Sequence, residues 1–202
     1  MATTTRADGI LQEVYQDLTI DHLSPIEKYL ELDRIVEKLH ELHNRTPINI
    51  GTTGTISERL CQLAISSITA FEGNTRRYDS NWKWLGDFLL PGHPYDISVS
   101  VKSFKAKERL LASGTGSLLT PTIGWGLFND PSEWGAERCA SYLYRGFSSI
   151  YMPAYLLERL PSNSLAVKNI NGKPLLRNYL SFPRDLENAV LPTINRIDIR
   201  QL

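Results

Sequence analysis

The sequence predicts an α/β domain in which a mixed central sheet is flanked by helices and preceded by a helical N-terminal part. Apolar residues at helical spacing dominate residues 7–45. Two short strand patterns joined by a proline- and glycine-containing turn follow at residues 84–104, and strand and helix patterns alternate from there onward. We therefore expect residues 1–48 to form the helical part and residues 49–202 to form the α/β core.

The helical part is expected to contain two helices. The first covers residues 8–18. The second begins at Ser24, because a serine cap, Pro25 in the first turn and Glu27 three residues after the serine form a capping-box pattern. It ends before Pro47. Charges of both signs cover this part, which favours a solvated bundle face over a dimerisation or DNA-contacting surface.

Residues 49–55 are rich in glycine and threonine and are interpreted as a loop, because they lack the Gly-Lys-Ser/Thr of a phosphate-binding P-loop. A helix with an apolar stripe is expected to follow over residues 55–71. Glu58 falls in the first turn of that helix, where a carboxylate interacts favourably with the helix dipole. This structural role competes with a role for Glu58 as a metal ligand.

The two central strands are joined by a turn at residues 91–94. In the second strand, apolar and polar residues alternate, so one face is expected to be buried and the other to be solvated or used for chemistry. The apolar face carries Ile97, Val99 and Val101, and the polar face carries Asp96, Ser98, Ser100 and Lys102. Asp87 lies across the turn. Asp87 and Lys102 together indicate a place for a metal and a phosphate.

The rest of the chain is expected to alternate between helices and strands. A short helix over residues 103–113 brings a basic cluster next to the central strands. The expected elements after it are a strand at 121–128, a helix capped by residues 129–132 and ending at Tyr144, a strand at 148–152, a helix at 153–160, a hairpin around Asn171 and Gly172, and a helix at 183–190.

Composition limits the class of protein. Lys and Arg number 22 and Asp and Glu also number 22, so attraction to nucleic acid would depend on a local basic patch. The chain contains no run of apolar residues long enough for a transmembrane helix, and residues 1–8 lack the apolar run of a signal peptide. Cys61 and Cys139 lie far apart without metal-binding spacing, so we expect reduced thiols in a cytoplasmic protein.

The central strands resemble the PD-(D/E)xK nuclease superfamily, the fold of most type II restriction endonucleases. Asp87 matches the first acid of that family and Lys102 matches its lysine, but Ser100 stands where the second acid is expected. One subset of restriction enzymes is similar, because serine replaces the strand acid and a glutamate in the following helix supplies the carboxylate. Here Glu108 is the candidate donor. Asp96 and Glu58 are the alternatives, and Glu58 matches a glutamate that many members carry on the first core helix.

The resemblance covers roughly residues 54–152 and implies a helix–β–β–β–helix–β core. It implies a homodimer that hydrolyses phosphodiester bonds at specific sites in double-stranded DNA with Mg²⁺ in a bacterial cytoplasm. Asp87 and the Val101 carbonyl would hold the metal, and Lys102 would position the attacking water. The residues expected to contact phosphates are Lys105, Lys107 and Arg109, and those expected to reach base edges are Arg76, Arg77, Ser113 and Thr115.

Two alternatives remain open at this point. The serine in place of an acid and the balanced charge fit a non-catalytic DNA-binding or assembly protein with the same α/β build. Ser100 and Lys102 also fit a hydrolase in which a lysine activates a serine nucleophile. The sequence lacks a glycine-flanked nucleophile elbow, which disfavours the hydrolase.

Overall fold

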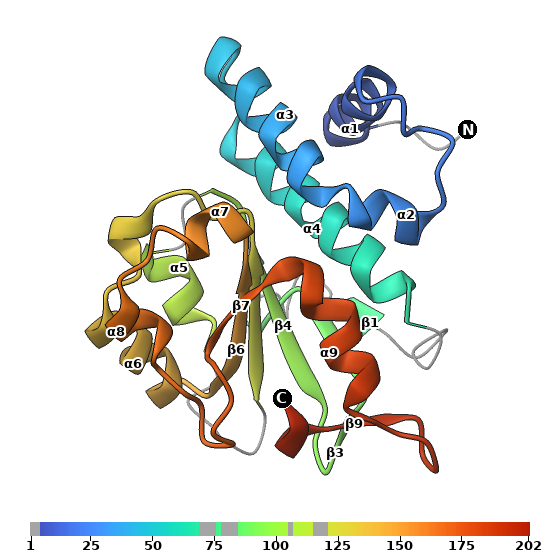
Figure 1. Ribbon diagram of the computed structural model, residues 1–202. Helices are drawn as coiled ribbons and strands as arrows, with labels where there is room; N and C mark the ends of the chain where they lie inside the picture. The colour runs from blue at the N-terminus through green and yellow to red at the C-terminus, as the bar shows by residue number, and fades with distance from the viewer. Residues whose placement is uncertain (1–4, 69–75, 78–84, 105–106, 115–120) are drawn as a thin grey trace.

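The computed structural model describes residues 5–68, 76–77, 85–104, 107–114 and 121–202. Its centre is a six-stranded sheet with the strand order β1-β2-β4-β5-β6-β7. β1 and β4 both pair antiparallel with β2, whereas β4 to β7 are parallel to one another. The strands are β1 (Arg76–Arg77), β2 (Phe88–Leu90), β4 (Ile97–Lys102), β5 (Thr122–Gly126), β6 (Phe147–Met152) and β7 (Leu176–Asn178). The predicted mixed sheet with flanking helices is confirmed (Figure 1).

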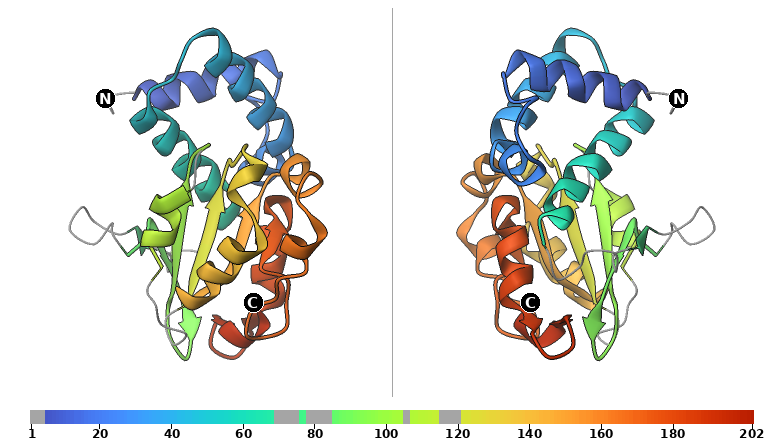
Figure 2. Two further views of the ribbon diagram at one scale, coloured as in Figure 1. Left: turned by 90° about the vertical axis from the view of Figure 1, so that its left-hand side faces the viewer. Right: turned by 90° about the vertical axis from the view of Figure 1, so that its right-hand side faces the viewer.

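The N-terminal helices stand at one end of the sheet, and α4 extends from them into the core (Figure 2). These helices are α1 (Arg6–Asp17), α2 (Pro25–Leu30), α3 (Leu32–Arg45) and α4 (Ile50–Ser66). The capping box of Ser24 and Glu27 is present as predicted. The single helix expected after Ser24 is divided into α2 and α3, because the backbone at Glu31 departs from helical geometry (φ −87°, ψ 11°).

The start of α4 differs from the prediction. α4 begins at Ile50 and includes most of the glycine- and threonine-rich stretch, because the Asn49 side chain caps it by accepting a hydrogen bond from the Thr52 N–H at 2.8 Å. Within the helix, the Thr55 hydroxyl donates to the Gly51 carbonyl. Glu58 therefore lies about two turns into α4, beyond the reach of the dipole effect expected for a first turn.

The sheet separates two apolar cores. Ile97, Val99 and Val101 of β4 face α4 and α9 (Phe182–Asn188), as predicted. The second core lies on the opposite side, where α5 (Lys107–Ala112) and α6 (Ala136–Tyr144) pack against the sheet. Figure 1 shows the two layers of helices on either side of the strands.

The serines on the polar face of β4 are buried, whereas this face was expected to be solvated or used for chemistry. Ser98 and Ser100 have exposed fractions of 4% and 0%. The Ser98 hydroxyl donates to the Leu85 carbonyl at 2.5 Å, and the Ser100 hydroxyl is hydrogen-bonded to Ser113, the residue after α5. Each buried hydroxyl is thus satisfied by a neighbouring segment. The polar residues of this face that are partly exposed are Lys102, at the end of the strand, and Asp96, immediately before the strand.

The C-terminal part completes the sheet and adds a second, smaller one. β3 (Gly92–His93), β9 (Arg196–Asp198) and β8 (Val190–Leu191) form a three-stranded sheet. The hairpin predicted around Asn171 and Gly172 is present as an antiparallel bridge between Lys168 and Pro174, and β7 follows it. β8 and β9 were not predicted. The remaining helices are η2 (Pro131–Glu133), α7 (Ala154–Leu157), α8 (Ser162–Leu165), η3 (Tyr179–Ser181) and η4 (Ile199–Gln201). Among the helices of the described residues, none has both the length and the apolar character needed to cross a membrane.

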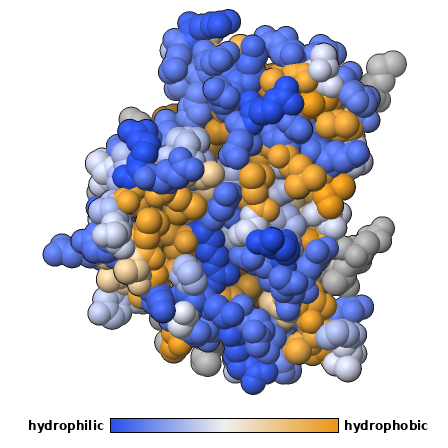
Figure 3. All heavy atoms as spheres, in the orientation of Figure 1, coloured by the Kyte–Doolittle hydropathy of each residue, from blue (hydrophilic) through white to orange (hydrophobic). Residues whose placement is uncertain are grey.

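Apolar side chains are exposed on α2. Ile26 and Leu30 lie one helical turn apart with exposed fractions of 49% and 66%. Figure 3 shows apolar surface in the region of α2, set among hydrophilic residues. The expected solvated face of the helical part therefore includes an apolar patch of these two residues.

Candidate functional site

The candidate site lies at the carboxyl end of β4, where the antiparallel and parallel parts of the sheet meet. Asp87 immediately precedes β2, and its backbone N–H donates to the Val99 carbonyl at 2.7 Å. The described pairing of β2 and β4 ends with Phe88 opposite Val99, and Asp87 lies immediately outside it. Ser100 and Lys102 alternate onto one face of β4, and the Asp87 carboxylate lies beside the Lys102 ammonium.

The Asp87 carboxylate and the Lys102 ammonium lie together, with Oδ2 and Nζ 3.8 Å apart. Asp87 Oδ2 accepts a hydrogen bond from the Val101 N–H at 2.7 Å. Lys102 Nζ donates to Ser100 Oγ at 2.7 Å and to the Val101 carbonyl at 3.0 Å. The β2–β4 pairing therefore brings together the residues that were predicted to form one site: Asp87, Ser100, Lys102 and the backbone of Val101.

The two charged groups are only partly exposed. The exposed fraction is 12% for the Asp87 side chain and 17% for the Lys102 side chain. Partial burial strengthens the attraction between them relative to a pair in water. It also leaves both groups within reach of a ligand. Ser100, in contrast, is fully buried behind the lysine.

Glu58 reaches the edge of the same strands from α4. Its carboxylate forms an ion pair with the Arg77 guanidinium, which also lies over the Phe88 ring, 5.4 Å from its centre. Burial raises the pKa of the Cys61 thiol, and the nearby Asp87 and Glu58 carboxylates raise it further. Both carboxylates thus disfavour the charged form of the same buried thiol. Arg77, which was predicted to reach base edges, forms this ion pair with Glu58 in the structure.

Asp96 does not join the site, although it was predicted as a possible metal ligand. It precedes β4 at the opposite end from Lys102, roughly 20 Å away at about 3.3 Å per residue. Its carboxylate pairs with Arg196 Nη1 at 2.9 Å and accepts a hydrogen bond from the Gly92 N–H at 3.3 Å. Asp96 therefore holds the β3–β9 end of the molecule and is not a ligand beside Asp87.

Ser113 also differs from its predicted role in reaching DNA bases. The residue is buried, with an exposed fraction of 8%. Its hydroxyl lies 2.7 Å from Ser100 Oγ and 2.6 Å from the Leu110 carbonyl. Ser113 therefore supports the site from behind. Its sequence position after a short helix gave no signal of this contact.

Several predicted contact residues cannot be placed. Lys105 and Thr115 lie outside the described residues. The backbone of Lys107, Glu108 and Arg109 forms the start of α5, but the structure does not describe their side chains. The same holds for the side chain of Arg76 in β1. The proposed phosphate contacts and the role of Glu108 consequently stay predictions.

Two oxygen atoms of the site could serve as ligands for the predicted Mg²⁺. Within the described parts of the chain, no group of three or more His, Cys, Asp or Glu side chains is arranged to hold a metal. Mg²⁺, however, is commonly bound by one or two carboxylates together with waters and substrate phosphates. The Asp87 carboxylate and the Val101 carbonyl, which both approach the Lys102 ammonium, supply the hard oxygen ligands of such a site.

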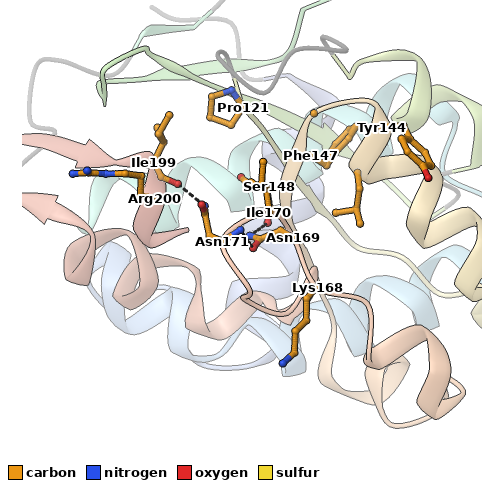
Figure 4. Close-up of a pocket in the computed structure, with 12 residues that line it drawn as sticks. Pro121, Tyr144, Phe147, Ser148, Lys168, Asn169, Ile170, Asn171, Ile199 and Arg200 are labelled. Carbon is orange, nitrogen blue, oxygen red and sulfur yellow. Dashed lines mark hydrogen bonds between the residues drawn. The ribbon is translucent and has the colours of Figure 1, made fainter.

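A separate cavity of about 470 Å³ lies at the other end of the strands, near the start of β6 (Figure 4). Its wall includes Pro121, Phe147 and the exposed Tyr144. Asn169 donates hydrogen bonds to the carbonyls of Ser148 and Leu202, so its amide nitrogen has a structural role. The described residues that line this cavity include no acid and no histidine. The cavity is therefore a poor candidate for the chemistry expected from Asp87 and Lys102.

Comparison with known proteins adds no family assignment, because the chain matches no protein-family model, no curated protein and no solved structure.

Proposed function

We propose that this protein is a Mg²⁺-dependent endonuclease of the restriction type, which hydrolyses phosphodiester bonds at specific sites in double-stranded DNA. The observation that carries the proposal is the 3.8 Å approach of the Asp87 carboxylate and the Lys102 ammonium at the end of two paired strands. Within the central sheet and the helices that join its strands, the order α4, β1, β2, β4, α5, β5 supports a PD-(D/E)xK core, because it follows the helix–β–β–β–helix–β arrangement of that family; β3, between β2 and β4, belongs to the smaller sheet.

The chain's own groups have distinct roles in this reaction. Asp87 and the Val101 carbonyl would hold Mg²⁺, and the chemistry that the metal would supply is to polarise a phosphate oxygen and to make water more acidic near neutral pH. The Val101 N–H fixes the orientation of the Asp87 carboxylate. Lys102 orients the attacking water and balances the negative charge on the phosphate. Its hydrogen bonds to Ser100 and Val101 keep the ammonium at the edge of the sheet.

Glu58 is our candidate for the second acid among the described carboxylates. Asp96 lies at the opposite end of β4. Glu58 and Asp87 instead both raise the pKa of the Cys61 thiol, and the Glu58 side chain is only 15% exposed. In this role the carboxylate would leave Arg77 when DNA and metal bind.

The Ser100–Lys102 hydrolase is a weaker candidate, despite the 2.7 Å hydrogen bond between the two side chains. A nucleophile must reach its substrate, and Ser100 has an exposed fraction of 0%. Its hydroxyl is also hydrogen-bonded to Ser113. These contacts favour Ser100 as a support for Lys102.

A homodimer in the bacterial cytoplasm is part of the proposal, since a two-fold protein matches a two-fold DNA site. The exposed Ile26 and Leu30 on α2 support a surface for self-association. Replacing both with lysine should convert a dimer into a monomer in analytical ultracentrifugation. A wild-type protein that is monomeric at all concentrations would contradict this part of the proposal.

The activity is tested by incubating the protein with a long phage genome in Mg²⁺ or in EDTA, with DNA binding measured in parallel. We expect discrete fragments in Mg²⁺ and intact DNA in EDTA. DNA that is bound but never cut would instead support the non-catalytic DNA-binding alternative. DNA that is neither bound nor cut would overturn both.

A further inference from the structure

We propose that Ser113 is a positioning residue for Lys102, and that it acts through Ser100. The Ser100–Ser113 pair would take over one task of the carboxylate that Ser100 replaces, which is to aim the lysine ammonium. The inference rests on the proposed nuclease function, and it concerns a residue for which the sequence predicted a different role.

Three hydrogen bonds join the end of α5 to the end of β4. Lys102 Nζ lies 2.7 Å from Ser100 Oγ, which lies 2.7 Å from Ser113 Oγ. Ser113 Oγ lies 2.6 Å from the Leu110 carbonyl. The chain of contacts therefore begins at a backbone carbonyl of α5 and ends at the ammonium that borders the candidate metal site.

The direction of these bonds follows from the number of hydrogens. An ammonium only donates, a carbonyl only accepts, and each hydroxyl has a single hydrogen to donate. Ser113 Oγ is within donating distance of both Ser100 and Leu110, and all three contacts form at the same time only when Ser113 donates to Leu110 and Ser100 donates to Ser113. This leaves a lone pair of Ser100 Oγ for Lys102, so the orientation of Ser100 toward the lysine depends on Ser113.

Burial makes this arrangement rigid. Ser100 and Ser113 have exposed fractions of 0% and 8%, so water competes poorly for their hydroxyls. A carboxylate at position 100 would neutralise the ammonium as well as orient it. A neutral hydroxyl orients the ammonium and leaves its positive charge available for the phosphate, with Asp87 as the nearby anion.

Ser67 offers a matched control. It is the residue after α4, as Ser113 is the residue after α5, and its hydroxyl donates to the carbonyl of Ala64, three residues earlier, at 2.6 Å. The same bond in Ser113 joins it to Leu110 at 2.6 Å. Ser67→Ala thus removes an equivalent bond at a helix end without touching the Lys102 contacts.

The test measures kcat and KM for DNA cleavage with saturating Mg²⁺, together with the melting temperature of each variant. We expect Ser113→Ala to lower kcat about tenfold with KM unchanged, the size expected for one aligned hydrogen bond. Ser67→Ala should retain wild-type kcat. Ser113→Thr should retain most of the activity. Ser113→Val, whose side chain has the shape of threonine but no hydroxyl, should be as slow as Ser113→Ala. This second pair keeps the comparison valid if the alanine variant folds poorly.

The double variant Ser100→Ala/Ser113→Ala separates action through Ser100 from an independent effect. If Ser113 acts through Ser100, the double variant is no slower than Ser100→Ala. The inference would be overturned, with the nuclease function intact, by either of two results. One is a double variant whose loss of kcat equals the product of the losses in the two single variants, and the other is a wild-type kcat in Ser113→Val. A wild-type protein that cuts no DNA in Mg²⁺ would overturn the proposed function and with it the catalytic role of Ser113.

Discussion

The Asp87 carboxylate accepts a 2.7 Å hydrogen bond from the backbone N–H of Val101. It thereby replaces the backbone carbonyl that a neighbouring strand would offer to this N–H. Asp87 itself donates its backbone N–H to Val99, the previous residue of β4 whose backbone faces β2. The described strand β2 begins at Phe88, so the next N–H along this edge of β4 is satisfied by a side chain. The same oxygen that completes the sheet therefore lies beside Lys102.

This dual role predicts different stabilities for two Asp87 variants. Asp87→Asn retains a side-chain oxygen for the Val101 N–H, whereas Asp87→Ala leaves that partly buried group without this acceptor. We expect Asp87→Ala to lower the free energy of unfolding by about 1–3 kcal/mol more than Asp87→Asn does. Urea denaturation of both variants measures the difference, and equal stabilities would contradict the structural role of the carboxylate.

The Glu58–Arg77 ion pair predicts that substitutions of its two partners have unequal effects on the rate of DNA cleavage. If Glu58 is the second acid, Glu58→Gln should lower the cleavage rate at least about tenfold, because a neutral amide is a weaker metal ligand than a carboxylate. Arg77→Gln, which breaks the same ion pair, should change the rate by less than about threefold, since the acid is retained. Cleavage assays of the two variants test this, and equal losses would show that the pair matters for stability alone.

The environment of His40 predicts that acid destabilises the fold. Burial lowers the pKa of His40 below its ordinary value of 6.5, and the neighbouring His43 lowers it further. The ring also lies 4.5 Å from the Phe104 ring and 3.2 Å from the Tyr155 hydroxyl. As the pH falls through 6.5, the unfolded chain binds the proton more readily than the folded one, so stability decreases until the lower, folded-state pKa is reached.

His40→Gln should remove this part of the pH dependence, because glutamine retains a polar contact with Tyr155 and does not titrate. Urea denaturation at pH 7.5 and pH 5.5 measures it. We expect a smaller loss of stability in the variant than in the wild type between the two pH values. An identical loss in both proteins would contradict the assignment to His40.

The meeting of Asp87 and Lys102 could be predicted because the turn and the alternation of β4 specify it locally. The turn sets the pairing of the two strands, and the alternation places Lys102 on the face of Ser100. Burial of that face could not be predicted in the same way. It depends on α5 folding back over β4 so that Ser113 meets Ser100, and this contact joins positions 13 residues apart.

Other differences from the prediction have both local and long-range causes. The Asn49 cap and the Gly51–Thr55 bond make a helix from residues that usually favour loops, so α4 started earlier than predicted and Glu58 moved out of the first turn. β8 and β9 contain two or three residues each and are defined by their pairing partners. Asp96 was grouped with Lys102 by face, but Arg196, a hundred residues away, holds it at the opposite end.

The most direct test of the account is cleavage of duplex DNA in Mg²⁺ by the wild type, Asp87→Asn and Lys102→Met at equal concentration, with DNA binding measured in Ca²⁺. We predict site-specific cleavage by the wild type, at least about a hundredfold slower cleavage by each variant, and binding within about threefold of the wild type for both. Cleavage at the wild-type rate by either variant would show that Asp87 and Lys102 do not form the active site.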